Sequence, residues 1–417
     1  MSKFALLGDL VWAPQQDTIK EIKNGFIVVE NGIITNITKK KPDGLKIVDY
    51  SNKLIIPGFV DLHLHAPQYG FAGLFMDEEL LDWLNIHTFP EESKFKDTSH
   101  GKKAYSIFVR DLKKSPTTRA VIFGTIHTDS TILLMKLMEK SGLVSYVGKV
   151  NMVRNAPDYL CESLEESISE TYRYIELSKN FKRTKAIITP RFVPTCSDEL
   201  LTKLGKIAKE KNLPIQSHLS ENPMEIKWVK ELQPTSTCYG HAYERFGLMT
   251  NKTIMAHGVW PSETEYDLLK KTGCFIAHSP ESNMNLASGI APLRSYLNKG
   301  INIGLATDVA GGSSLSMIKA MTLAIQNSKL YWRYIDNKCK PISFTEGFWL
   351  GTKAGGSFFG KVGSFEEGYD GDFIVLDDDI KNESILKLTP AQRLEFYCYR
   401  HQEKEPVAKY VMGKQLF

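Results

Sequence analysis

The sequence lacks an apolar run that approaches the roughly 18 residues needed to cross a membrane. Its first residues lack a charged segment followed by an apolar one, so we expect no secretory signal. No long basic block is present and the net charge is only +4, which argues against nucleic acid or an anionic membrane as a partner. These absences favour a cytoplasmic protein.

Cysteine is sparse and follows no pattern. The six cysteines are scattered and no CxxC pair occurs, which favours reduced thiols over disulfides or a cysteine metal site. Low-complexity tracts, repeats and flexible linkers are also missing. The chain has 417 residues, too many for one small core, and a barrel with an appended module would fit this length.

Both ends of the chain read as short strands. An Asn-Gly pair at 31–32 separates two apolar runs, Phe26–Val29 and Ile33–Ile37, and is a strong signal for a hairpin. Strand-like runs return after residue 363, for example at Phe373–Leu376. We therefore expect residues 1–57 and 363–417 to pair into one small β-sandwich module.

Residues 58–362 follow a different pattern, in which apolar runs of strand length alternate with amphipathic helices. This alternation is typical of an α/β protein and predicts a TIM-type (β/α)8 barrel. The eight expected strands lie near Gly58–His63, Arg119–Thr125, Val144–Asn151, Ala186–Arg191, Pro214–His218, Thr253–His257, Cys274–His278 and Ile301–Asp308.

The first of these strands ends in a histidine pair, His63-Leu64-His65, within the stretch Leu54–Tyr69. Strand residues two apart point to the same side, with Cβ atoms roughly 7 Å apart, so both imidazoles can converge on one metal ion. A histidine pair of this kind is weak evidence on its own, because exposed or core histidines are common.

Polar side chains also stand at the ends of four later strands. Arg191 ends the fourth strand, His218 the fifth, His257 the sixth and Asp308 the eighth. Catalytic groups of (β/α)8 barrels lie at the carboxyl ends of the strands, so this shared position predicts one site.

Several motifs together resemble the amidohydrolase superfamily and, within it, the guanine deaminases. They are PGFVDLHLHAPQY at 57–69, TIHTDS at 125–130, TPRF at 189–192, QSHLSEN at 216–222, MAHG at 255–258 and GLATDVAGG at 304–312. The resemblance implies metal-dependent hydrolysis of guanine to xanthine and ammonia. The chain departs from the pattern at 115–118 (SPTT) and 277–280 (AHSP), beside the expected pocket, which bears on fine substrate preference.

The resemblance implies one metal ion held by His63, His65, His218 and Asp308. This nitrogen-rich set suits Zn(II), with Fe(II) or Mn(II) as alternatives. Relatives with two metals carry a modified lysine at the end of the fourth strand. Here that position reads Pro-Arg-Phe at 190–192, so we expect a single ion.

Three side chains are implied in the chemistry. Glu221 lies three residues after His218, where it would move a proton from water to the ring. The alternative for Glu221 is a charge at the start of the following helix. His257 would orient the attacking water, with a direct or indirect metal role as the rival, and Asp308 would accept a proton as well as bind metal.

We expect Gln68, Arg191 and Phe192 to recognise the substrate, together with His218, Glu221 and Asp308. The Arg191 fork matches the O6/N7 edge of guanine, and the Gln68 amide can both donate and accept. Phe192 would either stack on the ring or pack in the core. We expect the aromatic side chains of the following segment, Phe71, Phe75, Trp83 and Phe89, to pack in a lid-like loop, with one or two of them shielding the site from water as the alternative. We expect His127 to make structural hydrogen bonds, with a place in the pocket as the alternative.

Two other functions remain open. A sister hydrolase would deaminate or dechlorinate another purine, nucleoside or triazine ring, and a non-catalytic assembly protein would use this fold without its metal ligands. This chain keeps all of those ligands, which argues against the assembly protein. For the oligomeric state, the resemblance to the family implies a homodimer.

Overall fold

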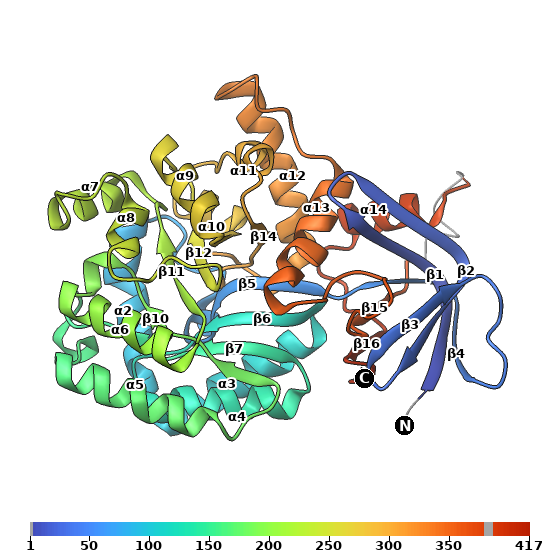
Figure 1. Cartoon of the computed structure of the whole chain (residues 1–417), viewed down its shortest axis with the longest axis horizontal. Coiled ribbons are helices and arrows are strands. Elements are labelled where there is room, and N and C mark those ends of the chain that lie inside the picture. Colours follow the sequence, from blue (N-terminus) through green and yellow to red (C-terminus); the bar gives the residue numbers. More distant parts are fainter. Residues whose placement is uncertain (1–2, 379–386) are drawn as a thin grey trace.

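The computed structural model describes residues 3–378 and 387–417. Figure 1 shows a set of parallel strands surrounded by helices and, to one side, a separate sheet made from both ends of the chain. No helix in the described ranges is both long and apolar enough to span a membrane. All six cysteines carry free thiols.

The side sheet has seven strands in the order β17-β16-β15-β4-β1-β2-β3. They are β1 (Lys3–Gln15), β2 (Thr18–Glu30), β3 (Ile33–Thr38), β4 (Lys46–Pro57), β15 (Phe373–Leu376), β16 (Ala408–Val411) and β17 (Lys414–Gln415). β1 and β4 run parallel, and the other neighbours are antiparallel. Pairing between β4 and β15 confirms that the two terminal segments share a sheet, while the sandwich itself stays a prediction.

The predicted hairpin joins β2 to β3. Asn31 and Gly32 have φ angles of 52° and 88°, the left-handed conformation that both central residues of a type I′ turn adopt. Because this turn matches the twist of the flanking strands, it fixes the register in which Glu30 pairs with Ile33.

The parallel strands form two four-stranded sheets and a short pair. The first sheet holds β5 (Phe59–His65), β6 (Thr117–Phe123), β7 (Val144–Gly148) and β9 (Thr184–Ala186). The second holds β11 (Ile215–Leu219), β12 (Thr253–His257), β13 (Phe275–His278) and β14 (Ile303–Leu305), and β8 (Val150–Asn151) pairs with β10 (Thr189–Pro190). Each of the eight predicted segments therefore contains strand.

Three predicted strands differ most from the observed ones. The third and fourth are each interrupted, giving β7 with β8 and β9 with β10. The eighth ends at Leu305 because the next backbone groups leave the ladder: the Thr307 N–H donates to the Asp61 carboxylate, and the Asp308 N–H donates to the His63 carbonyl.

Backbone hydrogen bonds connect the two four-stranded sheets on both sides. The Gln216 N–H donates to the Ile188 carbonyl on one side, and the His65 N–H donates to the Val309 carbonyl on the other. The sheet pairings by themselves define separate sheets, so these bonds support, without establishing, a closed eight-stranded barrel.

Helices follow most of the parallel strands and cover their outer face (Figure 1). They are α1 (Leu80–Trp83), α2 (Phe89–Ser93), α3 (Thr98–Lys114), α4 (Thr128–Ser141), α5 (Leu164–Ser178), α6 (Asp198–Lys211), α7 (Pro223–Leu232), α8 (Tyr239–Glu244), α9 (Glu263–Thr272), α10 (Pro280–Asn285), α11 (Leu293–Lys299), α12 (Met317–Tyr334), α13 (Phe344–Trp349) and α14 (Pro390–Arg400). The segment predicted as a lid-like loop after β5 is mostly helical, with η1 (Ala66–Phe71), α1, the π-helical η2 (Leu84–Thr88) and α2 in succession.

A buried ion pair joins the side sheet to the parallel strands. Arg119 on β6 donates to Asp372 at 2.7 Å and to Asp370 at 2.6 Å, and the Arg119 and Asp372 side chains are 5% and 0% exposed. Asp372 also accepts from the backbone N–H of Met412 in the C-terminal segment. Three distant parts of the sequence thus meet at one guanidinium.

We predict that Arg119→Ala lowers the free energy of unfolding by roughly 3–5 kcal/mol, because Asp372 is left buried without its cation. The matched control is Arg110→Ala, which removes an exposed pair with Asp111 and should cost less than about 1 kcal/mol. Urea unfolding of both variants measures the difference, and equal midpoints would contradict this role of the buried pair.

Candidate metal centre and active site

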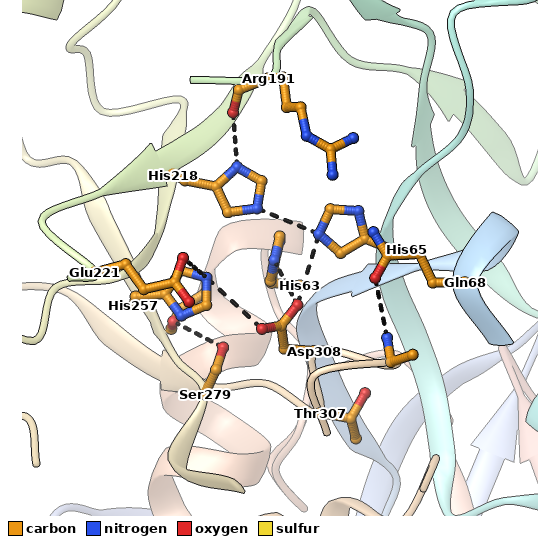
Figure 2. A network of polar contacts seen from close by, with 12 residues as sticks. His63, His65, Gln68, Arg191, His218, Glu221, His257, Ser279, Thr307 and Asp308 are labelled. Atoms are coloured by element: carbon orange, nitrogen blue, oxygen red, sulfur yellow. Dashed lines mark hydrogen bonds and ion pairs between the residues drawn. The ribbon is translucent and has the colours of Figure 1, made fainter. Parts of the chain in front are cut away.

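Strand β5 delivers three polar side chains to one side. Asp61, His63 and His65 are spaced two apart, so they share a face, and all three are at most 4% exposed. The other members of the cluster come from the ends of β11 and β12 and from the residues after β14. Figure 2 shows the imidazoles of His63, His65 and His218 converging beside the Asp308 carboxylate.

The distances in this cluster are short. His63 Nε2 lies 3.0 Å and His65 Nε2 3.6 Å from Asp308 Oδ1, and His65 Nε2 lies 3.2 Å from His218 Nε2. Two overlapping groups have donor atoms within 4.8 Å of one another: His63, His65 and His218 form one, and His63, His257 and Asp308 the other. The predicted ligands are therefore together in space.

The donor set fits a metal ion. His218 Nδ1 lies 2.6 Å from the Arg191 carbonyl oxygen, which can only accept, so Nδ1 carries the hydrogen and Nε2 directs a lone pair into the cluster. Burial lowers the pKa of His65 and of His218 well below the usual value, with neighbouring histidines adding to the shift. Neutral imidazoles are the form that binds metal.

Asp308 supplies the negative charge. Burial raises the pKa of its carboxyl, but His63 and His257 outweigh this effect and bring the pKa to about 2. Asp308 has a φ of 48° and His257 a φ of 75°, left-handed conformations that non-glycine residues seldom adopt. Such strained positions cluster at functional sites, where the surrounding structure holds them.

Glu221 lies on the other side of His257, with its Oε2 3.3 Å from His257 Nε2. It precedes helix α7, whose N-cap is Asn222 and whose capping box is completed by Glu225. The Glu221 side chain is thus free of any capping role and is directed toward the cluster (Figure 2). Burial raises the pKa of Glu221 well above its usual value, and Asp308 and Glu225 add to this shift.

His257 has a defined orientation. Its Nδ1 lies 2.9 Å from Asn283 Oδ1, an acceptor, so Nδ1 donates and Nε2 presents a lone pair to Glu221 and Asp308. Burial lowers the pKa of His257 to about 4. A neutral ring at this position can accept a hydrogen bond from water or help to hold a cation.

A cavity opens beside the cluster. Its lining combines the acid–base groups with apolar side chains, as is usual for small-molecule sites. The lining residues are His65, Gln68, Leu80, Trp83, Leu84, Arg191, Phe192, His218, Glu221, His257, Leu286, Asp308 and Gly311. All the predicted recognition residues therefore border one cavity.

The other candidates take different places. Trp83 lines the cavity, while Phe71 and Phe89 are buried behind it and Phe75 is 45% exposed against His87. His127 lies in a separate depression with Lys96 and Cys161. These positions agree with packing roles for most of the aromatic side chains.

Sequence reasoning missed the residues that hold the site together, among them Asp61, Glu92, Asn283 and Thr307. Asp61 accepts hydrogen bonds from the Thr307 backbone at 3.1 Å and hydroxyl at 2.5 Å, joining β5 to the segment that carries Asp308. The two-residue spacing from Asp61 to His63 could have revealed its face. No local signal marks Glu92 or Asn283, because their partners are distant in sequence.

Comparisons with known proteins were made on sequence and on structure. A model of the amidohydrolase family matches residues 54–400. Guanine deaminase of Rattus norvegicus is 43% identical over 333 residues, which cover 78% of this chain and 73% of the rat protein. Guanine deaminase of Escherichia coli (strain K12) is 32% identical over 388 residues, covering 91% of this chain and 85% of that protein.

A solved structure is also similar over its whole length. The crystal structure of guanine deaminase from C. acetobutylicum, with guanine bound in the active site, superposes with a TM-score of 0.97 and 44% identity. The match covers 100% of both chains. The similarity therefore includes the side sheet as well as the parallel strands.

We predict that His65→Ala lowers the metal content of the purified protein from about one ion per chain to below about a tenth of an ion per chain. Even a residue that only supports a metal ligand typically contributes 10–100-fold in metal affinity, and a ligand itself should contribute more. His127→Ala is the control, because His127 also follows a strand but lies outside the cluster. Elemental analysis of both variants measures the loss. Full metal content in His65→Ala would remove this residue from the ligand set.

Proposed function

Because the chain belongs to the amidohydrolase family, we propose that its cavity binds a purine base and that the enzyme deaminates guanine to xanthine and ammonia. Relatives of high coverage are named for this activity, and one of them holds guanine in its active site. The observation in this chain that carries the proposal is the position of Glu221, a buried carboxylate between the histidine cluster and the cavity that Arg191 and Gln68 line.

The cation that we propose is one Zn(II), with Fe(II) as the alternative. His63, His65, His218 and Asp308 would hold it, as three neutral nitrogen donors and one carboxylate suit this ion. When bound, such a cation acts as a Lewis acid and lowers the pKa of water toward about 7.

The proposed proton transfers use groups of this chain. Water adds its oxygen to C2 of guanine, and Glu221 passes one proton from that water to the ring nitrogen beside C2. The raised pKa of Glu221 suits a group that must hold a proton and then give it up. Asp308 takes the second proton, which ends on the amine as it leaves as ammonia, and the Nε2 of His257 orients the attacking water.

Recognition in this proposal rests on the opposite wall. Arg191 would donate to the O6/N7 edge of guanine, and Gln68 would meet the N1 to N3 side. The Phe192 ring is 5% exposed, borders the cavity and packs edge-on against Trp228, so it would form one face of the slot.

At the level of the whole chain, we propose that residues 58–362 close into a (β/α)8 barrel that carries the chemistry. Residues 1–57 and 363–417 would form the accompanying β module. We also propose a cytoplasmic location and a homodimer, following the composition and the family.

The direct test measures ammonia release from guanine, adenine, 2-aminopurine and a triazine, together with the metal content of the same sample. We expect guanine to be deaminated with the highest kcat/KM. A protein that contains metal but releases ammonia only from another ring would replace guanine with that ring as the substrate.

We further predict that Glu221→Gln keeps the metal and the fold but loses more than about a hundredfold in kcat, the typical effect of a positioned acid–base group. Glu263→Gln, an exposed carboxylate on α9, is the control and should behave as the wild type. Turnover of the Glu221 variant within a few fold of the wild type would exclude Glu221 from proton transfer.

A further inference from the structure

The two polar side chains that the proposed function assigns to purine recognition both donate to one carboxylate. Gln68 Nε2 donates to Glu92 Oε1 at 2.8 Å, and Arg191 Nη1 donates to Glu92 Oε2 at 2.7 Å. Glu92 lies on α2, in the segment after β5, and is 2% exposed. Glu92 belongs to none of the sequence motifs and does not line the cavity.

The contact fixes the direction of the Gln68 amide. Its Oε1 accepts from the Ala310 N–H at 3.2 Å while its Nε2 donates to Glu92. Turning the amide over would place its NH2 against the Ala310 N–H and its oxygen against the Glu92 carboxylate. One N–H of Gln68 is therefore left for a ligand, in a direction that Glu92 and Ala310 determine together.

Helix α2 also holds Arg191 from two sides. Glu92 accepts from one arm of the guanidinium, and the ring of Phe89, on the same helix, lies 5.1 Å from the guanidinium carbon. The remaining N–H groups of Arg191 can only donate. The cavity wall built on this pair consequently presents fixed donors and would favour a ring with a carbonyl oxygen facing it.

Glu92 also balances the buried positive charge of Arg191. Arg191 is 2% exposed and lies close enough to affect the pKa of both His65 and Glu221. A buried guanidinium without a counter-ion is costly, and the Glu221 carboxyl lies within its electrostatic reach. Pairing with Glu92 keeps Arg191 directed at the cavity.

We propose that Glu92 is the positioning residue that sets the specificity of this pocket for a 6-oxo purine, acting through Gln68 and Arg191. The inference rests on the proposed function, because it concerns how that site tells guanine from a ring without the O6 oxygen. Glu92 itself does not touch the reacting atoms.

The test compares guanine with 2-aminopurine, which carries the same C2 amine but lacks O6. The kcat and KM of guanine are measured for the wild type, Glu92→Ala and Glu92→Gln. The competitive inhibition constant Ki of 2-aminopurine is measured for the same three proteins, because Ki is defined whether or not that compound turns over. We expect Glu92→Ala to raise the KM of guanine roughly a hundredfold, the usual scale when a binding group is misplaced by about 1 Å. The Ki of 2-aminopurine should rise much less, since this compound shares the ring edge that Gln68 meets and the N7 atom but has no O6 contact to lose.

Glu92→Gln keeps the shape of the side chain but offers its oxygen to only one of the two donors. We expect Glu92→Gln to lower the ratio of Ki (2-aminopurine) to KM (guanine) by about tenfold. This variant replaces Glu92→Ala in the test if the alanine variant folds poorly. The matched control is Glu162→Gln. Glu162 is a buried carboxylate that lies 2.7 Å from Lys149 and does not line the cavity. That variant should leave the ratio unchanged.

Each outcome is informative. A fall in the ratio of Ki (2-aminopurine) to KM (guanine) in both Glu92 variants, with metal content unchanged, supports the proposal. An equal loss for guanine and 2-aminopurine would reduce Glu92 to a structural residue and overturn it. If the wild type releases no ammonia from guanine, the proposed function itself fails, which is a separate result.

Discussion

The structure depends on the burial of three imidazoles and one carboxylate at a single point. Imidazole nitrogens from β5 and β11 face one another and Asp308 at hydrogen-bond distance, away from water. Buried polar groups of this kind are costly unless they are paired or bind a metal. The rest of the molecule holds these groups in place: Asp61 ties β5 to the Thr307 segment, and the Arg191 carbonyl fixes the His218 ring.

A second set of residues orients the side chains that border the cavity. Asn283 sets the hydrogen on His257, Glu225 accepts from the backbone N–H of Glu221, and Glu92 orients the recognition wall. Each of these side chains is buried and acts through a neighbour that borders the cavity. Positions and protonation states are therefore set before any ligand enters, which is the condition for electrostatic stabilisation of a transition state.

Much of this could be predicted from the sequence because the signals are local. The period of two in His63-Leu64-His65, the Asn31-Gly32 turn and the position of His218 and His257 at strand ends each follow from neighbouring residues. Strand ends were less predictable. The eighth strand is shorter than expected because Thr307 and Asp308 give their backbone N–H groups to β5, a contact between segments far apart in sequence. Glu92 was missed for the same reason, since nothing near it signals a partner at Arg191.

The central claim is that these buried donors share one cation beside a purine slot. An anomalous difference map from crystals grown with guanine, recorded at the zinc absorption edge, tests it most directly. The account predicts one strong peak per chain, about 2.1 Å from nitrogen atoms of His63, His65 and His218 and close to Asp308, with the guanine ring in the adjoining cavity. A map without a peak inside this cluster, or with guanine bound elsewhere, would contradict it.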